Sequence, residues 1–304
     1  MPLAITTPTG HIGSALVRRL LDAGRDDLVL LVRDASKLDA DVRDRVETRE
    51  GVLQDADYVR SATEGAEALF WLSPNDWTTP DLYGWYETLG RSAAGAVRAG
   101  GIGHVVHLSS EGAQERSGHG PVSGLGRIED ALDEAAEATG AAVRHLRPTY
   151  FMENFEAQIG SILQAGAVFF PVPPEAVRTG MIATRDIAAV AADLLLDGGW
   201  TGTDVLTLQG PRDVSYAEAA AVLSNGLGRE VRAQQVPEGA VADQLRGMGA
   251  TDAWADGLVE LYTKIGMEGY TNAPRSAETA TPTTLETYVA DTLRPMVEAA
   301  ESAS

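Results

Sequence analysis

The chain has 304 residues, of which 44% are hydrophobic, and it contains no cysteine. This suits one large α/β domain, or a dinucleotide domain with a smaller lobe, and excludes disulfides and thiolate nucleophiles. The formal net charge of −20 argues against binding to nucleic acids or anionic membranes. No signal-peptide pattern precedes the first strand and no apolar run approaches about 18 residues, so we expect a cytoplasmic protein.

Strand-like and helix-like segments alternate along the first two-thirds of the chain. Short apolar runs predict strands, and amphipathic segments with capping residues predict helices. The expected strands are 2–6, 28–32, 68–72, 104–108, 141–146 and 206–208. The expected helices are 11–23, 86–99, 127–139, 185–197 and 215–226. This alternation predicts an α/β fold with a doubly wound parallel sheet, the Rossmann arrangement.

The rhythm loosens after Pro148, which predicts a smaller C-terminal α+β substrate lobe. We assign residues 1–155 with about 184–209 to the dinucleotide domain, and about 156–183 with 210–304 to the lobe. Ser215 with Glu218 predicts a capping box at the start of a helix, and Thr283 with Glu286 predicts a second one.

A glycine-containing turn lies between the first strand and the first helix. Gly10 would let the backbone approach a pyrophosphate, Gly13 would let the helix pack on the strand, and the helix N-terminus would attract the phosphates. The residues expected at the cofactor are Thr9, Gly10, His11, Ile12 and Gly13. Thr7 occupies the place of the first glycine, so the turn geometry stays open. The alternative is an ordinary strand-to-helix turn with two glycines.

The end of the second strand bears on the choice of dinucleotide. Domains that prefer NAD usually place Asp or Glu there to accept a hydrogen bond from the ribose hydroxyl. Here Arg33 follows Val32, and Lys37 comes four residues later. A guanidinium can bind the 2′-phosphate, so we expect NADP(H). Asp34 leaves an alternative open, because it could pair with Arg33 instead.

Several segments together resemble the NmrA-like family of atypical short-chain dehydrogenases/reductases. The segments run from the glycine turn almost to the C-terminus, and the most specific is the one at residues 146–155. They are TPTGHIG, LLVRDASKL, HVVHLSSEGA, LRPTYFMENF, IATRDIAAVAADLLL and LTLQGPRDVSYAEAAAVLSNGLGR. The resemblance implies an NAD(P)-binding Rossmann domain, a smaller C-terminal lobe and a substrate between them.

The resemblance also implies roles for residues at strand ends. It places Ser73 and Pro74 beside the cofactor ribose, and Ser109 and Ser110 at the next strand end. It places Tyr150, Phe151 and Asn154 near the nicotinamide.

The chain departs from the family pattern at the proton relay. The Tyr-x-x-x-Lys pair of short-chain dehydrogenases falls here on Pro121 and Leu125, neither of which transfers a proton, and Val52 replaces a common Asp.

Three residues are candidates for chemistry: Glu111 as a general acid, Ser110 and Tyr150. For Glu111 the alternative is a surface residue in a loop. The candidates for a substrate pocket are Trp77, Trp85, Tyr86 and His119. For the aromatic residues the alternative is packing between a loop and a helix, and for His119 it is a solvated loop. No histidine spacing indicates a metal site.

These patterns favour an NADPH-dependent reductase of a small organic substrate, such as a quinone, an enone or a carbonyl compound. The missing Tyr and Lys keep two alternatives open. One is a non-catalytic NADP(H) sensor that acts through a protein partner, and the other is a cofactor-retaining isomerase or cyclase. The oligomeric state is open, with a homodimer as one option.

Overall fold

Seven parallel strands form the central sheet, in the order β3-β2-β1-β4-β5-β6-β9. The computed structural model describes residues 2–270 and 274–303. The strands are β1 (Leu3–Thr6), β2 (Leu28–Val32), β3 (Glu47–Glu50), β4 (Ala68–Leu72), β5 (His104–Leu108), β6 (Ala142–Pro148) and β9 (Thr203–Leu208). From β1 to β3 successive strands add on one side of β1, and from β4 onward they add on its other side. The crevice where such sheets bind ligands forms at this switch point, between β1 and β4.

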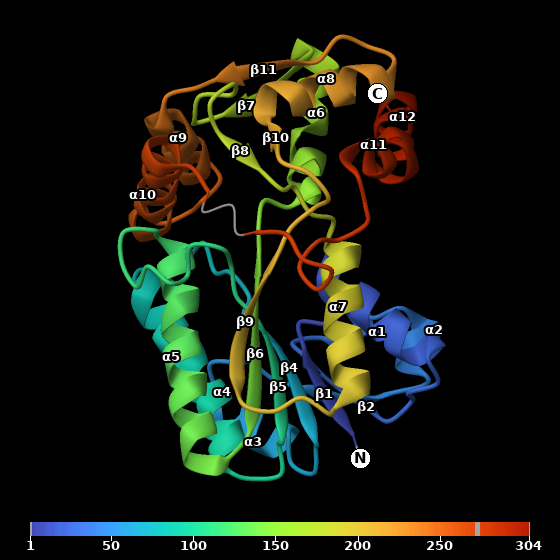
Figure 1. Cartoon of the computed structure of the whole chain (residues 1–304), viewed down its shortest axis with the longest axis vertical. Helices are drawn as coiled ribbons and strands as arrows, with labels where there is room; N and C mark the ends of the chain where they lie inside the picture. Colours follow the sequence, from blue (N-terminus) through green and yellow to red (C-terminus); the bar gives the residue numbers. More distant parts are fainter. Residues whose placement is uncertain (1, 271–273, 304) are drawn as a thin grey trace.

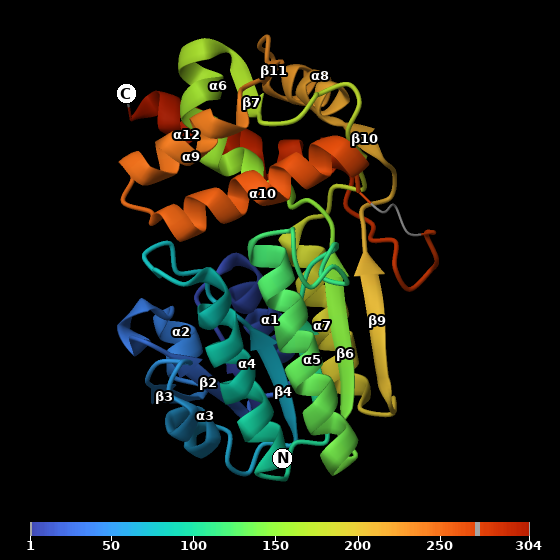
Figure 2. The same ribbon diagram turned by 90° about the vertical axis from the view of Figure 1, so that its left-hand side faces the viewer.

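Helices cover both faces of the sheet because its strands are apolar on both sides. In β1, Leu3 and Ile5 pack on the face covered by α1 and α7, whereas Ala4 packs on the face covered by α3, α4 and α5. Figure 1 shows α5 and α7 on opposite sides of the sheet, and Figure 2 looks onto the face that α4 and α5 cover. The helices are α1 (His11–Asp22), α2 (Ala40–Arg43), α3 (Ala56–Ala62), α4 (Leu82–Arg98), α5 (Pro121–Thr139) and α7 (Thr184–Asp197), with the short 3-10 helix η1 (Ala35–Lys37).

A smaller region lies beyond the carboxyl ends of the strands (Figure 1). It contains two short sheets, in which β7 pairs with β11 and β8 with β10, and it has its own apolar core. Its strands are β7 (Ala167–Phe170), β8 (Arg178–Thr179), β10 (Val214–Ser215) and β11 (Arg232–Gln235). Its helices are η2 (Met152–Gln158), α6 (Ile159–Ala165), α8 (Tyr216–Leu227), α9 (Glu238–Gly247), α10 (Asp252–Glu268), α11 (Leu285–Tyr288), η3 (Val289–Leu293) and α12 (Arg294–Ser302).

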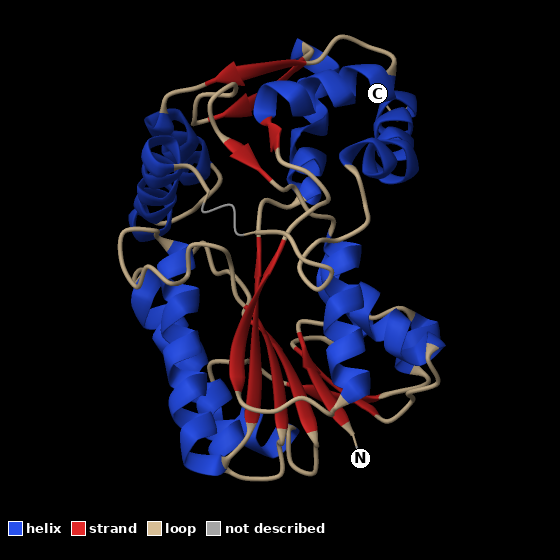
Figure 3. Ribbon diagram, viewed as in Figure 1, coloured by secondary structure: helices blue, strands red, loops and turns tan. Residues whose placement is uncertain are grey.

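The predicted Rossmann arrangement is confirmed, and six of the seven sheet strands coincide with or overlap the predicted ones (Figure 3). The capping box of Ser215 and Glu218 is present. The second predicted box is wrong, because Thr284 caps α11 and accepts from the Thr287 amide at 3.1 Å. Thr283 instead donates its hydroxyl to Asp186 at 2.8 Å. The assignment of residues to two domains stays a prediction.

Candidate cofactor and substrate sites

The turn between β1 and α1 is tight although it lacks the first glycine. Thr7 has a φ of 48°, in the left-handed region that a β-branched residue rarely adopts. Its hydroxyl donates to the Leu72 carbonyl at 3.3 Å. A Cβ at Gly13 would lie 2.2 Å from the Thr7 carbonyl oxygen and 2.9 Å from the Pro8 Cα. Position 13 therefore needs glycine for α1 to pack against the turn.

Gly10 faces open space instead. A Cβ there would meet only the Thr7 carbonyl oxygen, at 3.9 Å. Gly10 is also the N-cap of α1, with no side-chain cap and no acidic residue in the first turn. The first amides of the helix and the positive end of its dipole are thus available to an anion. The turn therefore fits the pyrophosphate of a dinucleotide.

Arg33 follows β2 directly and is exposed. Arg33 forms no hydrogen bond or ion pair with a described residue, and Asp34 in particular does not pair with it. The Asp34 carboxylate accepts instead from the Ser36 amide at 2.9 Å and caps η1. Lys37 and Thr9 line a small cavity of about 190 Å³ beside the turn. Lys37 thus lies beside the turn, and no described residue pairs with the Arg33 guanidinium, which leaves it available to an anion.

A cleft of about 550 Å³ runs along the carboxyl ends of β1, β4 and β5. Strand ends, the glycine turn and α10 all contribute to its wall. The lining residues are Thr7, Gly10, His11, Ile12, Leu72, Ser73, Asn75, Tyr86, Leu108, Ser109, Ser110, Pro121, Val122, Leu125, Phe151, Glu153, Asn154, Thr184, Trp254, Leu258 and Leu261. We call this space the cofactor cleft.

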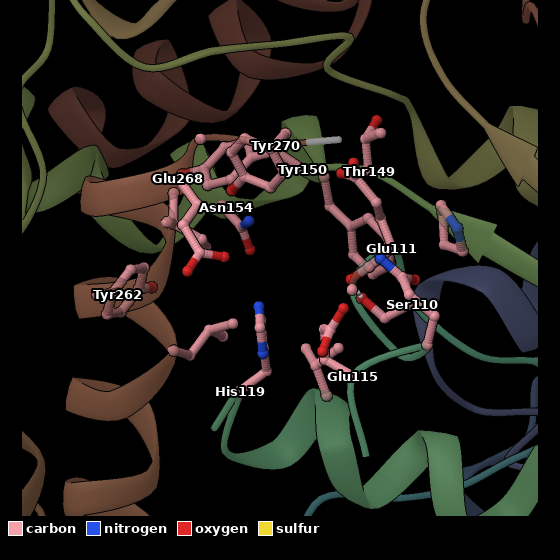
Figure 4. A pocket seen from close by; sticks show the side chains of 18 of the residues that line it. Ser110, Glu111, Glu115, His119, Thr149, Tyr150, Asn154, Tyr262, Glu268 and Tyr270 are labelled. Carbon is pink, nitrogen blue, oxygen red and sulfur yellow. Dashed lines mark hydrogen bonds between the residues drawn. The ribbon is translucent and has the colours of Figure 1, made fainter. Parts of the chain in front are cut away.

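A second cavity of about 400 Å³ adjoins the cofactor cleft. Figure 4 shows side chains from the loop after β5, the end of β6 and α10 around one space. The lining residues are Asn75, Ser110, Glu111, Gly112, Gln114, Glu115, His119, Val122, Pro148, Thr149, Tyr150, Phe151, Asn154, Leu261, Tyr262, Ile265, Glu268, Gly269 and Tyr270. Six of these residues also line the cofactor cleft: Asn75, Ser110, Val122, Phe151, Asn154 and Leu261. The two spaces share a wall, and we call the second one the substrate cavity.

A buried ion-pair network fixes the strand ends below both spaces. Ser109 donates its hydroxyl to Glu129 at 2.6 Å, and Arg147 donates to the same carboxylate at 2.6 and 2.8 Å. Burial alone would raise the pKa of Glu129, but the hydrogen bonds from Arg147 and Ser109 lower it to about 2. The Ser110 hydroxyl, in contrast, donates to the Glu111 carbonyl at 3.1 Å and forms no other hydrogen bond with the described part of the chain. Ser109 is thus held in the network, whereas Ser110 lies at the shared wall.

Tyr150 lies between two aromatic rings, edge-to-face with Phe155 and Tyr216. Burial raises the pKa of its hydroxyl well above the usual value of 10.0. Burial also raises the pKa values of Tyr262 and Tyr270 in the same cavity. The three phenols therefore stay neutral, and each is able to donate a hydrogen bond.

The structure brings most of the predicted site residues together. Glu111 is only 8% exposed and lines the substrate cavity, so it is not a surface residue. Ser110, Tyr150 and His119 line the same cavity, with the Nδ1 of His119 lacking a hydrogen-bond partner. The predicted residues that line the cofactor cleft are Gly10, His11, Ile12, Ser73, Tyr86, Ser109, Ser110, Phe151 and Asn154.

Other predicted residues lie outside both spaces. Trp77 is 42% exposed. Trp85 packs against the core and donates to the Pro74 carbonyl at 2.9 Å. Trp85, Pro74 and the exposed Trp77 line neither of the two spaces. At the relay positions, Pro121 and Leu125 line the cofactor cleft as apolar groups.

The sequence analysis missed the contribution of α10. Trp254, Leu258 and Leu261 line the cofactor cleft, and Tyr262 and Glu268 line the substrate cavity. A spacing of three or four residues is the signal that could have revealed one helix face over the site, and it holds for Trp254, Leu258, Leu261, Ile265 and Glu268. Asn75 and Glu115 were also missed, because isolated polar residues in loops carry no pattern.

Comparison with known proteins identifies the class. A model of the NAD(P)H-binding family matches residues 8–198, and the chain belongs to this family. Its Rossmann-type domain therefore binds a nicotinamide dinucleotide.

Three known proteins show what the chain is similar to. It is 31% identical to the NAD(P)H azoreductase of Xenophilus azovorans over 84% of each chain. A solved structure of an Escherichia coli NADPH-dependent quinone oxidoreductase with NADPH has a TM-score of 0.74 and 23% identity, and the match covers 94% of this chain and 98% of that one. A structure of an NmrA variant has a TM-score of 0.72 and 17% identity, over 99% and 97%. The expected NmrA-like fold is confirmed. Among the described residues, no helix is both long and apolar enough to cross a membrane.

Proposed function

We propose that this chain is an NADPH-dependent reductase of a small organic acceptor, such as a quinone, an enone or a carbonyl compound. The observation that carries this proposal is the wall shared by the two spaces. Ser110, Phe151 and Asn154 border both the cofactor cleft and the substrate cavity. A nicotinamide in the cleft would therefore lie next to an acceptor in the cavity. The names of the azoreductase and quinone oxidoreductase relatives support the same reaction class.

The reduced nicotinamide, when bound, supplies the hydride. The chain's own residues would hold the acceptor in place. Tyr150 stays protonated and could donate a hydrogen bond to an acceptor oxygen, with Ser110 beside it. Glu111 is the carboxyl group in this cavity that is most shielded from solvent, which suits a general acid.

The preference for NADPH over NADH rests on Arg33. Its guanidinium is free, and Lys37 follows one turn later. A charge-assisted hydrogen bond contributes about 1.5–3 kcal/mol, so losing it would weaken NADPH binding about 10- to 100-fold. We expect Arg33→Ala to raise the Kd for NADPH by this factor and to leave the Kd for NADH nearly unchanged.

Arg43→Ala is the matched control, because Arg43 is another exposed arginine, at the end of α2. Fluorescence titration with both cofactors would give the four dissociation constants. Equal losses of affinity for NADPH and NADH in Arg33→Ala would contradict the assignment of the 2′-phosphate to Arg33.

A second candidate function is a non-catalytic NADP(H) sensor. It is favoured by Pro121 and Leu125, which replace the proton-transferring pair and line the cofactor cleft as apolar groups. A steady-state assay of NADPH oxidation against quinones, enones and ketones separates the two functions. Saturable turnover supports the reductase. Tight NADPH binding without turnover of any acceptor supports the sensor.

A further inference from the structure

The substrate cavity has an unusual balance of charge. Three glutamates line it, Glu111, Glu115 and Glu268, and none of its described lining residues is a lysine or an arginine. Lys264 lies nearby and pairs with Glu268 at 2.9 Å, which neutralises one of the three. Glu115 forms no salt bridge with a described residue, although Lys264 also attracts it from farther away. His119 also lines the cavity, and its Nδ1 has no hydrogen-bond partner among the described residues.

Aromatic rings complete the wall. Tyr150, Phe151, Tyr262 and Tyr270 line the cavity, and burial keeps the three phenols neutral. Aromatic rings attract organic cations through their negative faces, and carboxylates attract them by charge. Glu115 and Glu268 approach the space from opposite sides, from the loop after β5 and from α10 (Figure 4). A flat cation between them would therefore contact both carboxylates and rings.

The relay positions point independently to the same ligand. Reduction of a neutral carbonyl or quinone requires a proton in addition to the hydride. The usual proton-transferring pair is replaced here by Pro121 and Leu125, which line the cofactor cleft as apolar groups. Reduction of a carbon that is doubly bonded to a positively charged nitrogen requires no proton. Glu111, the general acid proposed above for a neutral acceptor, has no proton to supply in this second reaction, so a cavity with carboxylates and without the relay suits it.

We propose that the substrate cavity binds a cationic aromatic acceptor and that the bond reduced is C=N⁺. This inference rests on the proposed reductase function and names its substrate class. The acceptor carbon, which is the carbon of C=N⁺ or a ring carbon conjugated with it, gains a hydride and forms a new C–H bond, while the π electrons shift so that one pair ends on nitrogen. The acceptor becomes a neutral amine, the reduced nicotinamide is oxidised, and no proton is taken up. Loss of charge in the product weakens its attraction to the carboxylates and favours its release.

Equilibrium binding tests the charge preference apart from turnover. Acridine and N-methylacridinium have the same ring system but differ in charge at a pH where acridine is neutral. Each is titrated by fluorescence into the protein saturated with NADP⁺. We expect wild type to bind the cation at least about fivefold more tightly, which is the upper range for one exposed charge pair. Equal affinity for the two probes would overturn the proposal.

Two substitutions at Glu115 locate the preference. Glu115→Gln should lower the ratio of cation to neutral affinity about threefold, and Glu115→Lys about tenfold, because reversal adds repulsion to lost attraction. Glu137→Gln is the matched control, since Glu137 is exposed near the far end of α5 and the substitution removes the same formal charge. If the ratio of cation to neutral affinity falls equally in Glu137→Gln, the preference comes from the overall charge of the chain and not from the cavity, and the proposal is overturned.

Turnover separates this inference from the proposed function. NADPH oxidation is followed with N-methylacridinium as the cationic acceptor and phenanthrenequinone as the neutral one, after subtraction of the uncatalysed rates. A higher kcat/KM for the cation, with no proton uptake, supports the inference. Turnover of the quinone without preference for the cation leaves the reductase standing and refutes the inference. Tight binding of the cation without turnover of either acceptor refutes the reductase, and with it the C=N⁺ reduction.

Discussion

Alanine substitutions at the two glycines of the β1–α1 turn would separate what the fold needs from what the cofactor needs. In Gly13→Ala the new Cβ would lie 2.2 Å from the Thr7 carbonyl oxygen and 2.9 Å from the Pro8 Cα. Both are backbone atoms, so the turn or α1 must move. Overpacking of this kind costs about 3 kcal/mol at its upper end. For a chain of this size we expect the Tm to fall by up to about 5 °C.

In Gly10→Ala the new Cβ would meet no protein atom closer than 3.9 Å. Gly10 has a φ of −84° and a ψ of 169°, which alanine also adopts without strain. We therefore expect the Tm of the free protein to change by less than about 2 °C. The methyl group would, however, occupy the space where the pyrophosphate would approach α1. We expect the Kd for NADPH to rise about 100-fold, the upper range for one misplaced methyl group.

Thermal unfolding followed by circular dichroism, with and without NADPH, would measure both effects. Saturation at about 100 times the Kd should stabilise wild type by about 2.7 kcal/mol. Gly160→Ala is the control, because no heavy atom lies within 4 Å of a Cβ there. It should keep the shift produced by NADPH. The reasoning is wrong if Gly10→Ala keeps this shift, or if it destabilises the free protein as much as Gly13→Ala does.

Three further predictions follow from the geometry. The pKa of Glu129 is lowered from 4.5 to about 2. The ionised carboxylate therefore stabilises the folded protein fully above pH 4.5, and this contribution is lost as the pH falls toward about 2. Urea unfolding should show that the free energy of unfolding of wild type falls by about 3 kcal/mol from this group as the pH is lowered, and Glu129→Gln should abolish that fall. A variant that loses as much stability in acid as wild type does would contradict the pairing. Tyr150→Phe should lower kcat about tenfold by removing a hydrogen bond. A limb of the wild-type pH profile below pH 10.0 that vanishes in this variant would show instead that Tyr150 ionises. Trp77→Ala should change the free energy of unfolding by less than about 0.5 kcal/mol and leave kcat/KM unaltered, because Trp77 is exposed and lines neither space. A loss of activity would show that Trp77 belongs to the site.

The sheet could be predicted because its strands are short, apolar on both faces and separated by helices. For this reason three predicted strands have the same first and last residues as the observed ones: 28–32, 68–72 and 104–108. Strand β3 was missed because Glu47–Glu50 is a half-exposed edge strand with no apolar run. The start of α4 was placed too late, because Asp81 caps it by accepting from the Gly84 amide, a local contact that periodicity does not show.

Most of the predicted residues that border the two spaces lie where the chain follows a strand into a turn or loop, and their roles stay predictions. Gly10, Ser110 and Glu111 sit at such places, and all three line one of the two spaces. The contribution of α10 depends on how the smaller region folds back over the sheet, which no local pattern encodes. The aromatic residues after β4 show the opposite error. Trp77 and Trp85 are concentrated in sequence, but one faces solvent and the other packs on the core.

The wall shared by the two spaces has a thermodynamic consequence. Phe151, Asn154 and Leu261 present one side to the cofactor cleft and another to the substrate cavity. A ligand that fixes their rotamers in one space therefore alters the surface that the other ligand meets. Linkage requires the effect to be reciprocal, so each ligand must change the affinity of the other by the same factor. Substitutions in this wall should shift both binding constants together, whereas substitutions at Tyr262, on the substrate side only, should shift one.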